Sequence, residues 1–271
     1  MPLGLKRVDS VRDAAAILAA DASARYLAGG TLLMRAVNRD DGAIGALVVT
    51  DQAGLDRIEV GGGRVTLGAA VTMAEVAGHP ELGFLAPVAG SIGGPAVRNM
   101  ATVGGNLFAR APYGDFAVAL LALGATVTLE SAAGSETVDL ETFLAGRGRK
   151  APAIVRAIAF DSPPLGAFRF AKVIRRKPHG AAVVTIAALL PLSGGKITGA
   201  RVAYGRMAPA AVRARAVEKA LEGRMLDEAA IAAAVAVSNE GCKPEDDAYG
   251  SAWYRTAVLP VHLKRLLTGK V

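Results

Sequence analysis

A segment rich in proline and glycine divides this chain into two parts whose patterns of strands and helices differ. The segment DSPPLG, at residues 161–166, combines adjacent prolines with a glycine, a composition that interrupts helices and strands alike. Before it, apolar runs typical of strands alternate with helical patterns. After it, three strand patterns precede three helical patterns. We therefore expect an α+β protein in which residues 166–271 form an antiparallel sheet with helices on one face.

Capping patterns and apolar runs predict the individual elements. Ser10 with Asp13, and Thr72 with Glu75, have the spacing of side chains that cap helix N-termini. We expect helices in residues 10–20, 31–37, 71–78, 113–125, 213–221, 227–238 and 252–268. We expect strands in residues 24–27, 46–51, 126–130, 153–160, 168–175, 181–190 and 197–207, and a hairpin in residues 56–70.

The positive charge of the chain is concentrated in its C-terminal part. Residues 1–150 contain 13 Lys and Arg against 15 Asp and Glu, whereas residues 151–271 contain 18 against 9, a net charge of +9. An anionic partner or ligand is therefore expected to bind the C-terminal part.

Cysteine content and hydropathy limit the class of protein. Cys242 is the single cysteine, which excludes an internal disulfide and a cluster held by four thiolates, and favours a reducing compartment. The longest apolar runs, at residues 116–129 and 181–192, are shorter than a membrane span. The three histidines lie in different segments, so we expect no metal site. These features predict a cytoplasmic protein without a membrane span.

Two pairs of adjacent glycines each follow an apolar run and precede a small polar residue. They occur in YLAGGT, residues 26–31, and in RNMATVGGNL, residues 98–107. With 32 glycines in the chain, a pair alone is weak evidence, and a structural turn explains either stretch. Glycine nevertheless permits positive φ angles, and successive backbone N–H groups form concave anion sites. Two such stretches could hold the two phosphates of one ligand.

The chain resembles the FAD-binding subunit of the molybdenum hydroxylases, in which medium subunits of carbon monoxide dehydrogenase and bacterial xanthine dehydrogenase occur. The resemblance lies in LAGGT at 27–31, RNMATVGGNL at 98–107, Pro112, Asp115, ALLALGATVTL at 119–129 and FRFAKVIRR at 168–176. P-loop and Rossmann motifs are absent from the sequence. The resemblance implies an FAD-binding domain of the vanillyl alcohol oxidase type at residues 1–162, with subdomains at about 1–55 and 56–162. A C-terminal flavoprotein domain would occupy residues 166–271.

The resemblance also implies the residues that bind FAD. Backbone donors to the diphosphate would come from Ala28, Gly29, Gly30 and Thr31, and a second cradle from Thr102, Gly104, Gly105 and Asn106. Asp115 would accept a hydrogen bond from a hydroxyl of the sugar or ribityl chain, because a carboxylate repels phosphate. Alternatively, Asp115 caps the helix that follows it. Lys172 would approach the flavin, where a cation stabilises the anionic reduced ring. Alternatively, Lys172 and Arg175 are solvent-exposed residues at the edge of a strand.

Two residues and one four-residue segment depart from the family pattern. Leu32 replaces a polar residue that follows the threonine in many relatives, and Ala111 replaces an aspartate before the proline. KPHG, at residues 177–180, replaces an acidic residue expected beside the basic pair, which leaves the surroundings of the flavin edge undetermined.

The resemblance further implies partner chains. In the family a large molybdopterin-binding subunit hydroxylates the substrate, and a small subunit with two [2Fe–2S] clusters passes electrons to FAD on the medium subunit. This chain would act in a dimer of heterotrimers and reduce a soluble acceptor, with no catalytic acid or base of its own.

Two other functions stay open from the residues alone. A stand-alone flavin oxidoreductase, resembling UDP-N-acetylenolpyruvoylglucosamine reductase, would need its own catalytic acid. The sequence around the acidic residues marks none of them as a candidate for that role. A nucleic-acid-binding protein would use the basic C-terminal part, but that part has few aromatic residues and no RNA-recognition motif. A docking face for the iron–sulfur subunit or for an anionic acceptor explains the charge better, so we expect no nucleic-acid partner.

Overall fold

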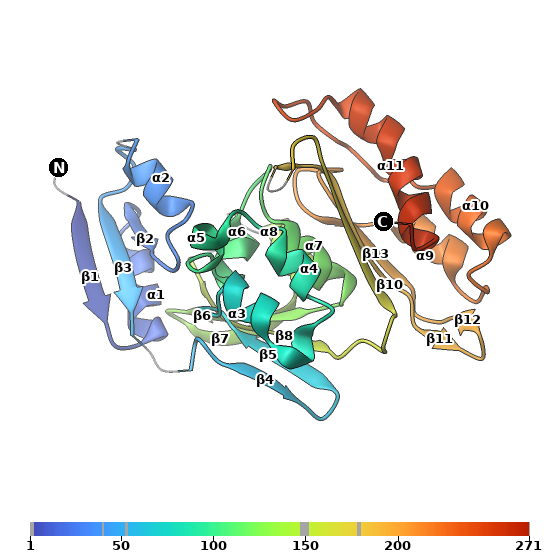
Figure 1. The fold of residues 1–271 in the computed structure, drawn as a ribbon. Coiled ribbons are helices and arrows are strands. Elements are labelled where there is room, and N and C mark those ends of the chain that lie inside the picture. The colour runs from blue at the N-terminus through green and yellow to red at the C-terminus, as the bar shows by residue number, and fades with distance from the viewer. Residues whose placement is uncertain (1–2, 40, 52–53, 147–151, 178–179, 271) are drawn as a thin grey trace.

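Three larger β-sheets follow one another along the chain, and helices pack between and around them (Figure 1). The computed structural model describes residues 3–39, 41–51, 54–146, 152–177 and 180–270. The predicted mixture of helices and sheets is confirmed. Among the described residues, no helix has the length and apolar composition needed to cross a membrane.

The N-terminal sheet is parallel, because helices connect its strands. It consists of β1 (Gly4–Val8), β3 (Ala46–Thr50) and β2 (Ala24–Tyr26) in that order, with α1 (Val11–Ala20) and α2 (Leu33–Val37) in the connections. Ser10 Oγ accepts a hydrogen bond from the Asp13 N–H at 3.0 Å, which confirms the predicted start of α1. Val11, Ala14 and Val48 are buried in a small core between α1 and this sheet.

The central sheet is antiparallel and packs against short helices. Its strands, in spatial order, are β4 (Ile58–Gly61), β5 (Arg64–Gly68), β8 (Ile154–Asp161), β6 (Thr126–Ser131) and β7 (Gly134–Asp139). The helical elements are α3 (Met73–Gly78), the 3₁₀ turn η1 (Pro80–Leu82), α4 (Ala86–Gly90), α5 (Pro95–Arg98), α6 (Val103–Phe108), α7 (Asp115–Ala122) and α8 (Leu140–Gly146). The hairpin and the capping box of Thr72 and Glu75 are confirmed. Sequence reasoning missed β7 and the helices α4, α5, α6 and α8.

The C-terminal sheet is antiparallel and carries three helices, as predicted. Its spatial order is β14 (Val212–Arg213), β13 (Arg201–Gly205), β10 (Ala182–Leu189) and β9 (Phe168–Ile174), with a small hairpin of β11 (Leu192–Ser193) and β12 (Lys196–Ile197) beside it. The helices are α9 (Arg215–Leu221), α10 (Glu228–Ala236) and α11 (Ala252–Leu267). The proline-containing segment lies between β8 and β9, where Leu165 is fully exposed.

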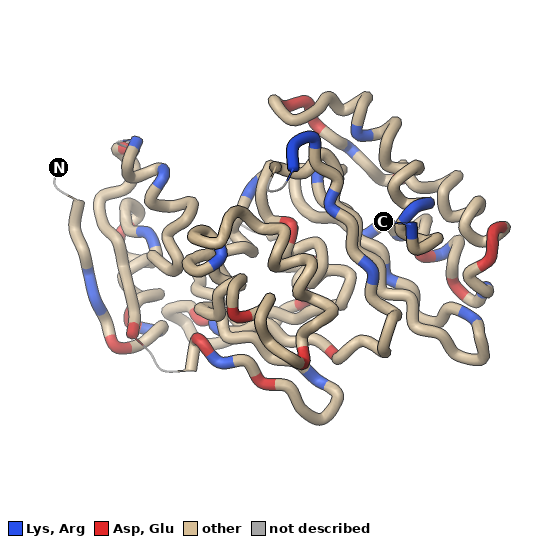
Figure 2. The backbone as a smooth tube through the Cα atoms, in the orientation of Figure 1, with Lys and Arg blue, Asp and Glu red and all other residues tan. Residues whose placement is uncertain are grey.

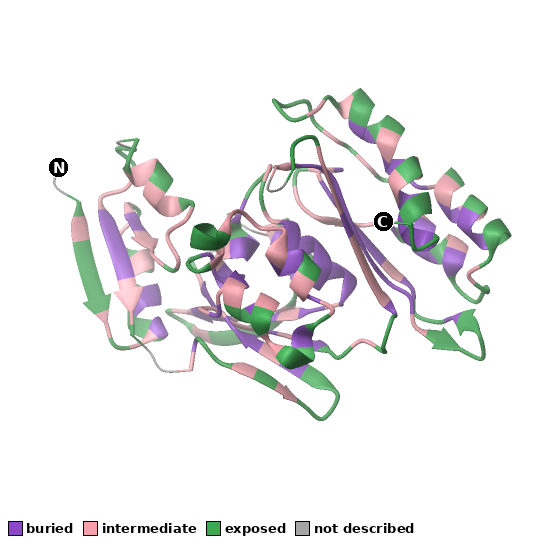
Figure 3. Ribbon diagram, in the orientation of Figure 1, coloured by how far each residue is buried: buried purple, intermediate pink, exposed green. Residues whose placement is uncertain are grey.

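Helix α7 joins the central and C-terminal parts of the molecule. All eight of its residues are buried, and it contacts β10 and β13 on one side and α4 and α6 on the other (Figure 3). Strand β10 is also buried along its whole length, because α7 covers one face and α11 the other. A helix that is apolar on every side is stable only in such a position.

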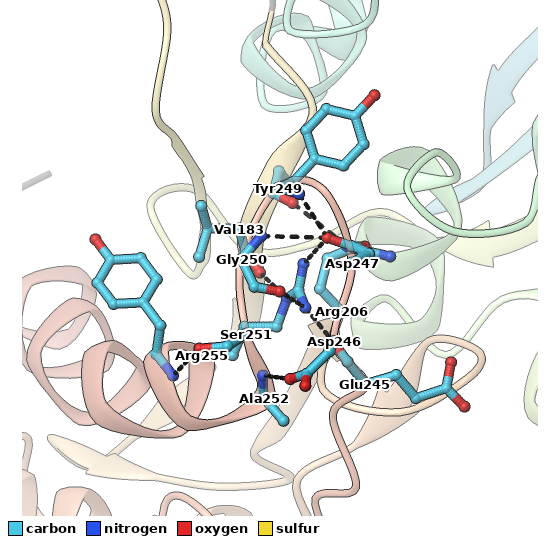
Figure 4. A network of polar contacts seen from close by, with 12 residues as sticks. Val183, Arg206, Glu245, Asp246, Asp247, Tyr249, Gly250, Ser251, Ala252 and Arg255 are labelled. Carbon is cyan, nitrogen blue, oxygen red and sulfur yellow. Dashed lines mark hydrogen bonds and ion pairs between the residues drawn. The ribbon is translucent and has the colours of Figure 1, made fainter.

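Arg255 attaches the loop before α11 to strand β10 (Figure 4). Its side chain is fully buried, and its guanidinium donates hydrogen bonds to the backbone oxygens of Val183 at 3.0 Å, Gly250 at 2.6 Å and Glu245. It also pairs with the Asp247 carboxylate at 2.7 Å. The planar guanidinium donates in several directions at once, so a single side chain holds the loop in place.

Candidate cofactor-binding site

A cavity of about 1580 Å³ lies where the N-terminal sheet, the central sheet and strand β9 meet. This volume exceeds the roughly 300–1,000 Å³ of sites for drug-sized ligands and suits a dinucleotide. Its wall includes every residue that the resemblance assigned to FAD: Ala28, Gly29, Gly30, Thr31, Thr102, Gly104, Gly105, Asn106, Asp115 and Lys172. The fold thus brings together residues that are up to 144 positions apart in the sequence.

The first glycine stretch is a loop that follows β2 and forms part of the cavity wall. Gly30 has a φ angle of +69°, which favours glycine. A Cβ atom on Gly29 would lie 1.6 Å from the carbonyl oxygen of Met100, so this loop packs backbone to backbone against the second stretch. Within the described part of the chain, no group accepts a hydrogen bond from the backbone N–H of residues 28–31. Four consecutive donors can therefore bind an anion in the cavity.

The glycines of the second stretch lie in the first turn of α6, and the prediction that they offer free backbone donors is wrong. Thr102 caps the helix, and its Oγ1 accepts a hydrogen bond from the Gly105 N–H at 3.1 Å. The N–H of Gly104 donates to the Ala69 oxygen at 2.9 Å, and that of Asn106 donates to the Thr102 oxygen at 3.0 Å. The backbone N–H groups of residues 104–106 therefore donate to acceptors within the protein, either inside α6 or in the neighbouring segment at Ala69.

The second stretch contributes a closely packed wall and one amide group. A Cβ atom on Gly104 would lie 2.8 Å from the Cβ of Ala69, so glycine allows α6 to approach the chain at that point. Asn106 is 9% exposed, and its Oδ1 accepts a hydrogen bond from the Ala117 N–H at 3.3 Å. Because the oxygen faces α7, the side-chain NH₂ group is the part of Asn106 that can donate to a ligand.

Asp115 lies in the cavity wall as the first residue of α7, and the alternative that it caps this helix is wrong. The N-cap is Gly114, which has a φ angle of +98°. The Asp115 carboxylate pairs instead with Lys172 Nζ at 2.8 Å and accepts a hydrogen bond from Thr185 Oγ1 at 2.5 Å. Its position in the first helical turn also suits a negative charge.

The Lys172 side chain is largely shielded from solvent, so the alternative of a solvated strand edge is wrong for this residue. Its side chain is 10% exposed and donates a second hydrogen bond to the backbone oxygen of Ser91 at 2.9 Å. Arg175 is exposed, as that alternative predicts, and lies in a basic turn with Arg176 and Lys177 after β9 (Figure 2). Of the KPHG segment, residues 178 and 179 lie outside the described residues.

Sequence reasoning missed two contacts in the cavity wall. Arg35 of α2 donates a hydrogen bond to the Tyr113 hydroxyl at 3.0 Å and lies 5.7 Å from the centre of that ring. Phe108 of α6 packs edge to face on Phe143 of α8, with 5.5 Å between the ring centres. Each pair joins elements that are distant in sequence, and no local pattern indicates either contact.

Within the described residues, no group of three or more His, Cys, Asp or Glu side chains is arranged to hold a metal ion. Cys242 lies in the C-terminal part, half-buried, with its Sγ 3.8 Å from the Ser238 oxygen.

We expect Cys242 to react slowly with thiol reagents. Burial disfavours the thiolate and raises the pKa of Cys242 to about 11. At pH 8 its thiolate fraction is then on the order of 0.1%, against roughly a quarter for an unperturbed cysteine. A disulfide reagent followed by absorbance should react at least about 100-fold more slowly than with a free thiol, and about tenfold faster per pH unit between pH 8 and 10. Rapid modification at pH 8 would contradict the burial.

The sheets and the cavity define a protein of mixed α and β structure whose cavity has the size that a dinucleotide cofactor requires. The family model described as the FAD binding domain in molybdopterin dehydrogenase matches residues 2–160, and that described as the CO dehydrogenase flavoprotein C-terminal domain matches residues 169–269. The chain therefore belongs to the family of FAD-binding medium subunits of the molybdenum hydroxylases. It is an oxidoreductase flavoprotein subunit whose cofactor is FAD.

Curated relatives align with most or part of the chain. The carbon monoxide dehydrogenase medium chain of Afipia carboxidovorans is 30% identical over 268 residues, which cover 96% of this chain and 93% of that one. The glyceraldehyde dehydrogenase medium chain of Sulfolobus acidocaldarius is 32% identical over 176 residues, 63% of this chain and 62% of that one. The structure of reconstituted CO dehydrogenase from Oligotropha carboxidovorans superimposes with a TM-score of 0.91 at 28% identity, covering 99% of this chain and 97% of that chain.

The residues present fit FAD on grounds that are independent of these relatives. The loop at residues 28–31 offers backbone donors for a diphosphate, and Asp115 offers a carboxylate for hydroxyl groups. Phe108 and Phe143 add an apolar section to the same cavity wall, which suits an aromatic ring of the cofactor.

Proposed function

We propose that this chain is the FAD-carrying electron-transfer subunit of a molybdenum-containing hydroxylase or dehydrogenase. The observation that carries the proposal is the row of four backbone N–H groups, at residues 28–31, without an acceptor in the described chain and in the wall of a dinucleotide-sized cavity. FAD supplies the redox chemistry, and the residues of this chain bind and orient it.

In this proposal Ala28, Gly29, Gly30 and Thr31 bind the diphosphate through their backbone N–H groups. Thr102, Gly104, Gly105 and Asn106 form the opposite wall, with the Asn106 amide as donor. Asp115 accepts a hydrogen bond from a hydroxyl of the sugar or ribityl chain, and Lys172 lies near the flavin. The burial of Asp115 and Lys172 at the cavity wall supports these two roles.

The proposal includes partner chains. A large molybdopterin-binding subunit would oxidise the substrate, and a small [2Fe–2S] subunit would pass the electrons to this chain, which would reduce a soluble acceptor. The single cysteine supports the separate small subunit, because an iron–sulfur cluster needs several thiolates. We propose a dimer of heterotrimers that acts in the cytoplasm.

We also propose the division of the chain into an FAD-binding domain at residues 1–162 and a C-terminal domain at residues 166–271. The first would contain subdomains at about residues 1–55 and 56–162, with the diphosphate between them, as in the vanillyl alcohol oxidase type of fold. The separate parallel and antiparallel sheets on either side of the cavity support this arrangement.

Titration of the purified full chain with FAD tests the cofactor role, and co-purification from its native source tests the partners. We expect quenching of FAD fluorescence that saturates at one FAD per chain, and a complex with one large and one small Cys-rich chain. A chain that binds no FAD contradicts the proposal. A chain that binds FAD but reduces or oxidises a substrate without partners favours a stand-alone flavin oxidoreductase. Retention on DNA that falls with salt, without bound flavin, favours a nucleic-acid-binding protein.

Replacing Lys172 by methionine is expected to lower the midpoint potential of bound FAD by about 30 mV. The change removes a positive charge that would stabilise the anionic reduced ring and leaves Asp115 with one partner fewer. For a two-electron couple, about 30 mV corresponds to roughly 1.4 kcal/mol. Spectroelectrochemical titration measures the shift. Arg175→Met, which removes an exposed charge next to the same strand, is the matched control; an unchanged potential in Lys172→Met would contradict the placement of the flavin.

A further inference from the structure

Two residues of the C-terminal sheet, Lys172 and Thr185, hold the carboxylate of Asp115, and of these two Lys172 alone lines the cavity. We propose that the other, Thr185, is a positioning residue that sets the Asp115 carboxylate for the cofactor hydroxyl. This inference rests on the proposed function, in which Asp115 contacts FAD.

Thr185 is a polar residue in an otherwise apolar, buried strand, and its hydroxyl bonds to Asp115. It is fully buried in β10, whose other residues in the buried run AVVTIAAL are all apolar. A buried hydroxyl without a partner costs free energy, and the Thr185 hydroxyl donates its hydrogen bond to Asp115 Oδ1 at 2.5 Å. The polar residue in this apolar strand is therefore explained by Asp115.

The sheet register brings Thr185 and Lys172 to the same carboxylate. Thr185 of β10 lies directly opposite Lys172 of β9, and residues directly opposite in an antiparallel pair project from the same face of the sheet. Lys172 reaches Asp115 Oδ2 at 2.8 Å while Thr185 reaches Oδ1. Each carboxylate oxygen is thus held by a different strand.

Gly205 allows the close approach that this contact needs. It lies opposite Thr185 on the other side, in β13. A Cβ atom on Gly205 would lie 2.8 Å from Val118 Cγ2 of α7 and 3.1 Å from the Thr185 Cβ. Without a side chain at this position, α7 packs directly on the sheet, and its first residue comes within hydrogen-bonding distance of Thr185.

The arrangement orients Asp115 without using up its acceptor capacity. Each oxygen of a carboxylate accepts two hydrogen bonds, and the protein contacts described use one on each. Lys172 alone does not define the orientation, because an ammonium is a point charge on a flexible stem. The short contact with a β-branched residue, whose χ1 angle is restricted, fixes the plane of the carboxylate, so that the remaining acceptor positions serve the ligand.

The test is FAD titration of full-length variants that differ in the Thr185 hydroxyl. Thr185→Val keeps the shape and removes the donor, and we expect an FAD dissociation constant about tenfold higher than that of the wild type. Thr185→Ser keeps the donor, and we expect it to bind FAD within about threefold of the wild type. Thr126→Val is the matched control. Thr126 lies in β6, outside the cavity wall, and its hydroxyl donates a hydrogen bond to the Ala159 oxygen at 3.3 Å.

A double-mutant cycle distinguishes positioning from general stability. If Thr185 acts through Asp115, Thr185→Val adds no further loss of affinity to Asp115→Ala, whereas a separate packing role would multiply the two losses. Multiplied losses, or a Thr185→Val variant that binds FAD like the wild type, would overturn the proposal. If Asp115→Ala does not fold, the comparison of valine with serine decides. A wild-type chain that binds no FAD contradicts the proposed function itself and not only the role of Thr185.

Discussion

Replacing Gly29 by alanine is expected to weaken FAD binding by at least about a hundredfold. The added Cβ atom would lie 1.6 Å from the Met100 carbonyl oxygen, a backbone atom that cannot rotate away. The loop at residues 28–31 must therefore move away from Met100, and its N–H donors lose their alignment with the diphosphate. A displacement energy of about 3 kcal/mol corresponds to slightly more than a hundredfold in the dissociation constant. Fluorescence titration with FAD measures the change.

The control for this prediction is an alanine where a side chain has room. A Cβ atom on Gly42 would meet no atom of the surrounding structure within 4 Å, so Gly42→Ala is expected to bind FAD like the wild type. Circular dichroism of both variants shows whether the fold is kept. If folded Gly29→Ala binds FAD with unchanged affinity, the loop at residues 28–31 is not the diphosphate site.

Replacing Arg255 by methionine is expected to lower the free energy of unfolding by about 3–5 kcal/mol. The fully buried guanidinium satisfies three backbone oxygens and the Asp247 carboxylate, and methionine of similar length satisfies none of them. Arg206 also pairs with Asp247, and the backbone N–H groups of Tyr249 and Gly250 donate to the same carboxylate, so the loss falls mainly on the backbone oxygens. Urea unfolding followed by circular dichroism measures the difference.

Arg265 provides a matched control on the same helix. It is exposed in the last turn of α11, so Arg265→Met is expected to change the free energy of unfolding by no more than about 0.5 kcal/mol. An Arg255→Met variant as stable as this control would show that the loop at residues 245–251 folds without its buried cation.

The elements that sequence reasoning predicted are those with strong local signals. The helices at α1 and α3 begin at side chains that cap them, and β10 is an apolar run. By contrast, β7 reads GSETVD and has exposed side chains at most positions, so its pairing with β6 provides its stability and its own sequence does not. The missed helices α4, α5 and α6 contain four to six residues, too few for a helical period to appear.

The site was predictable where a family motif marks it and not where the fold assembles it. The residues of the two glycine stretches, Asp115 and Lys172 were named from the sequence, and all of them line the cavity. The use of their hydrogen bonds was not predictable. Gly104 and Gly105 looked like free donors, yet both N–H groups bond within the protein. Thr185 had one signal, a hydroxyl within an apolar run, but its partner lies 70 positions away.

By itself, the sequence determined the order of most strands and helices, the family and the positions of the residues around the cavity, because capping, periodicity and short motifs act over a few neighbouring residues. Only the tertiary structure decided which backbone donors are left for a ligand and which partners hold Asp115 and Lys172. Those outcomes depend on close contacts between segments that are distant in the sequence, such as Gly29 with Met100 and Gly205 with α7. A local sequence pattern does not indicate which distant segment will pack against it.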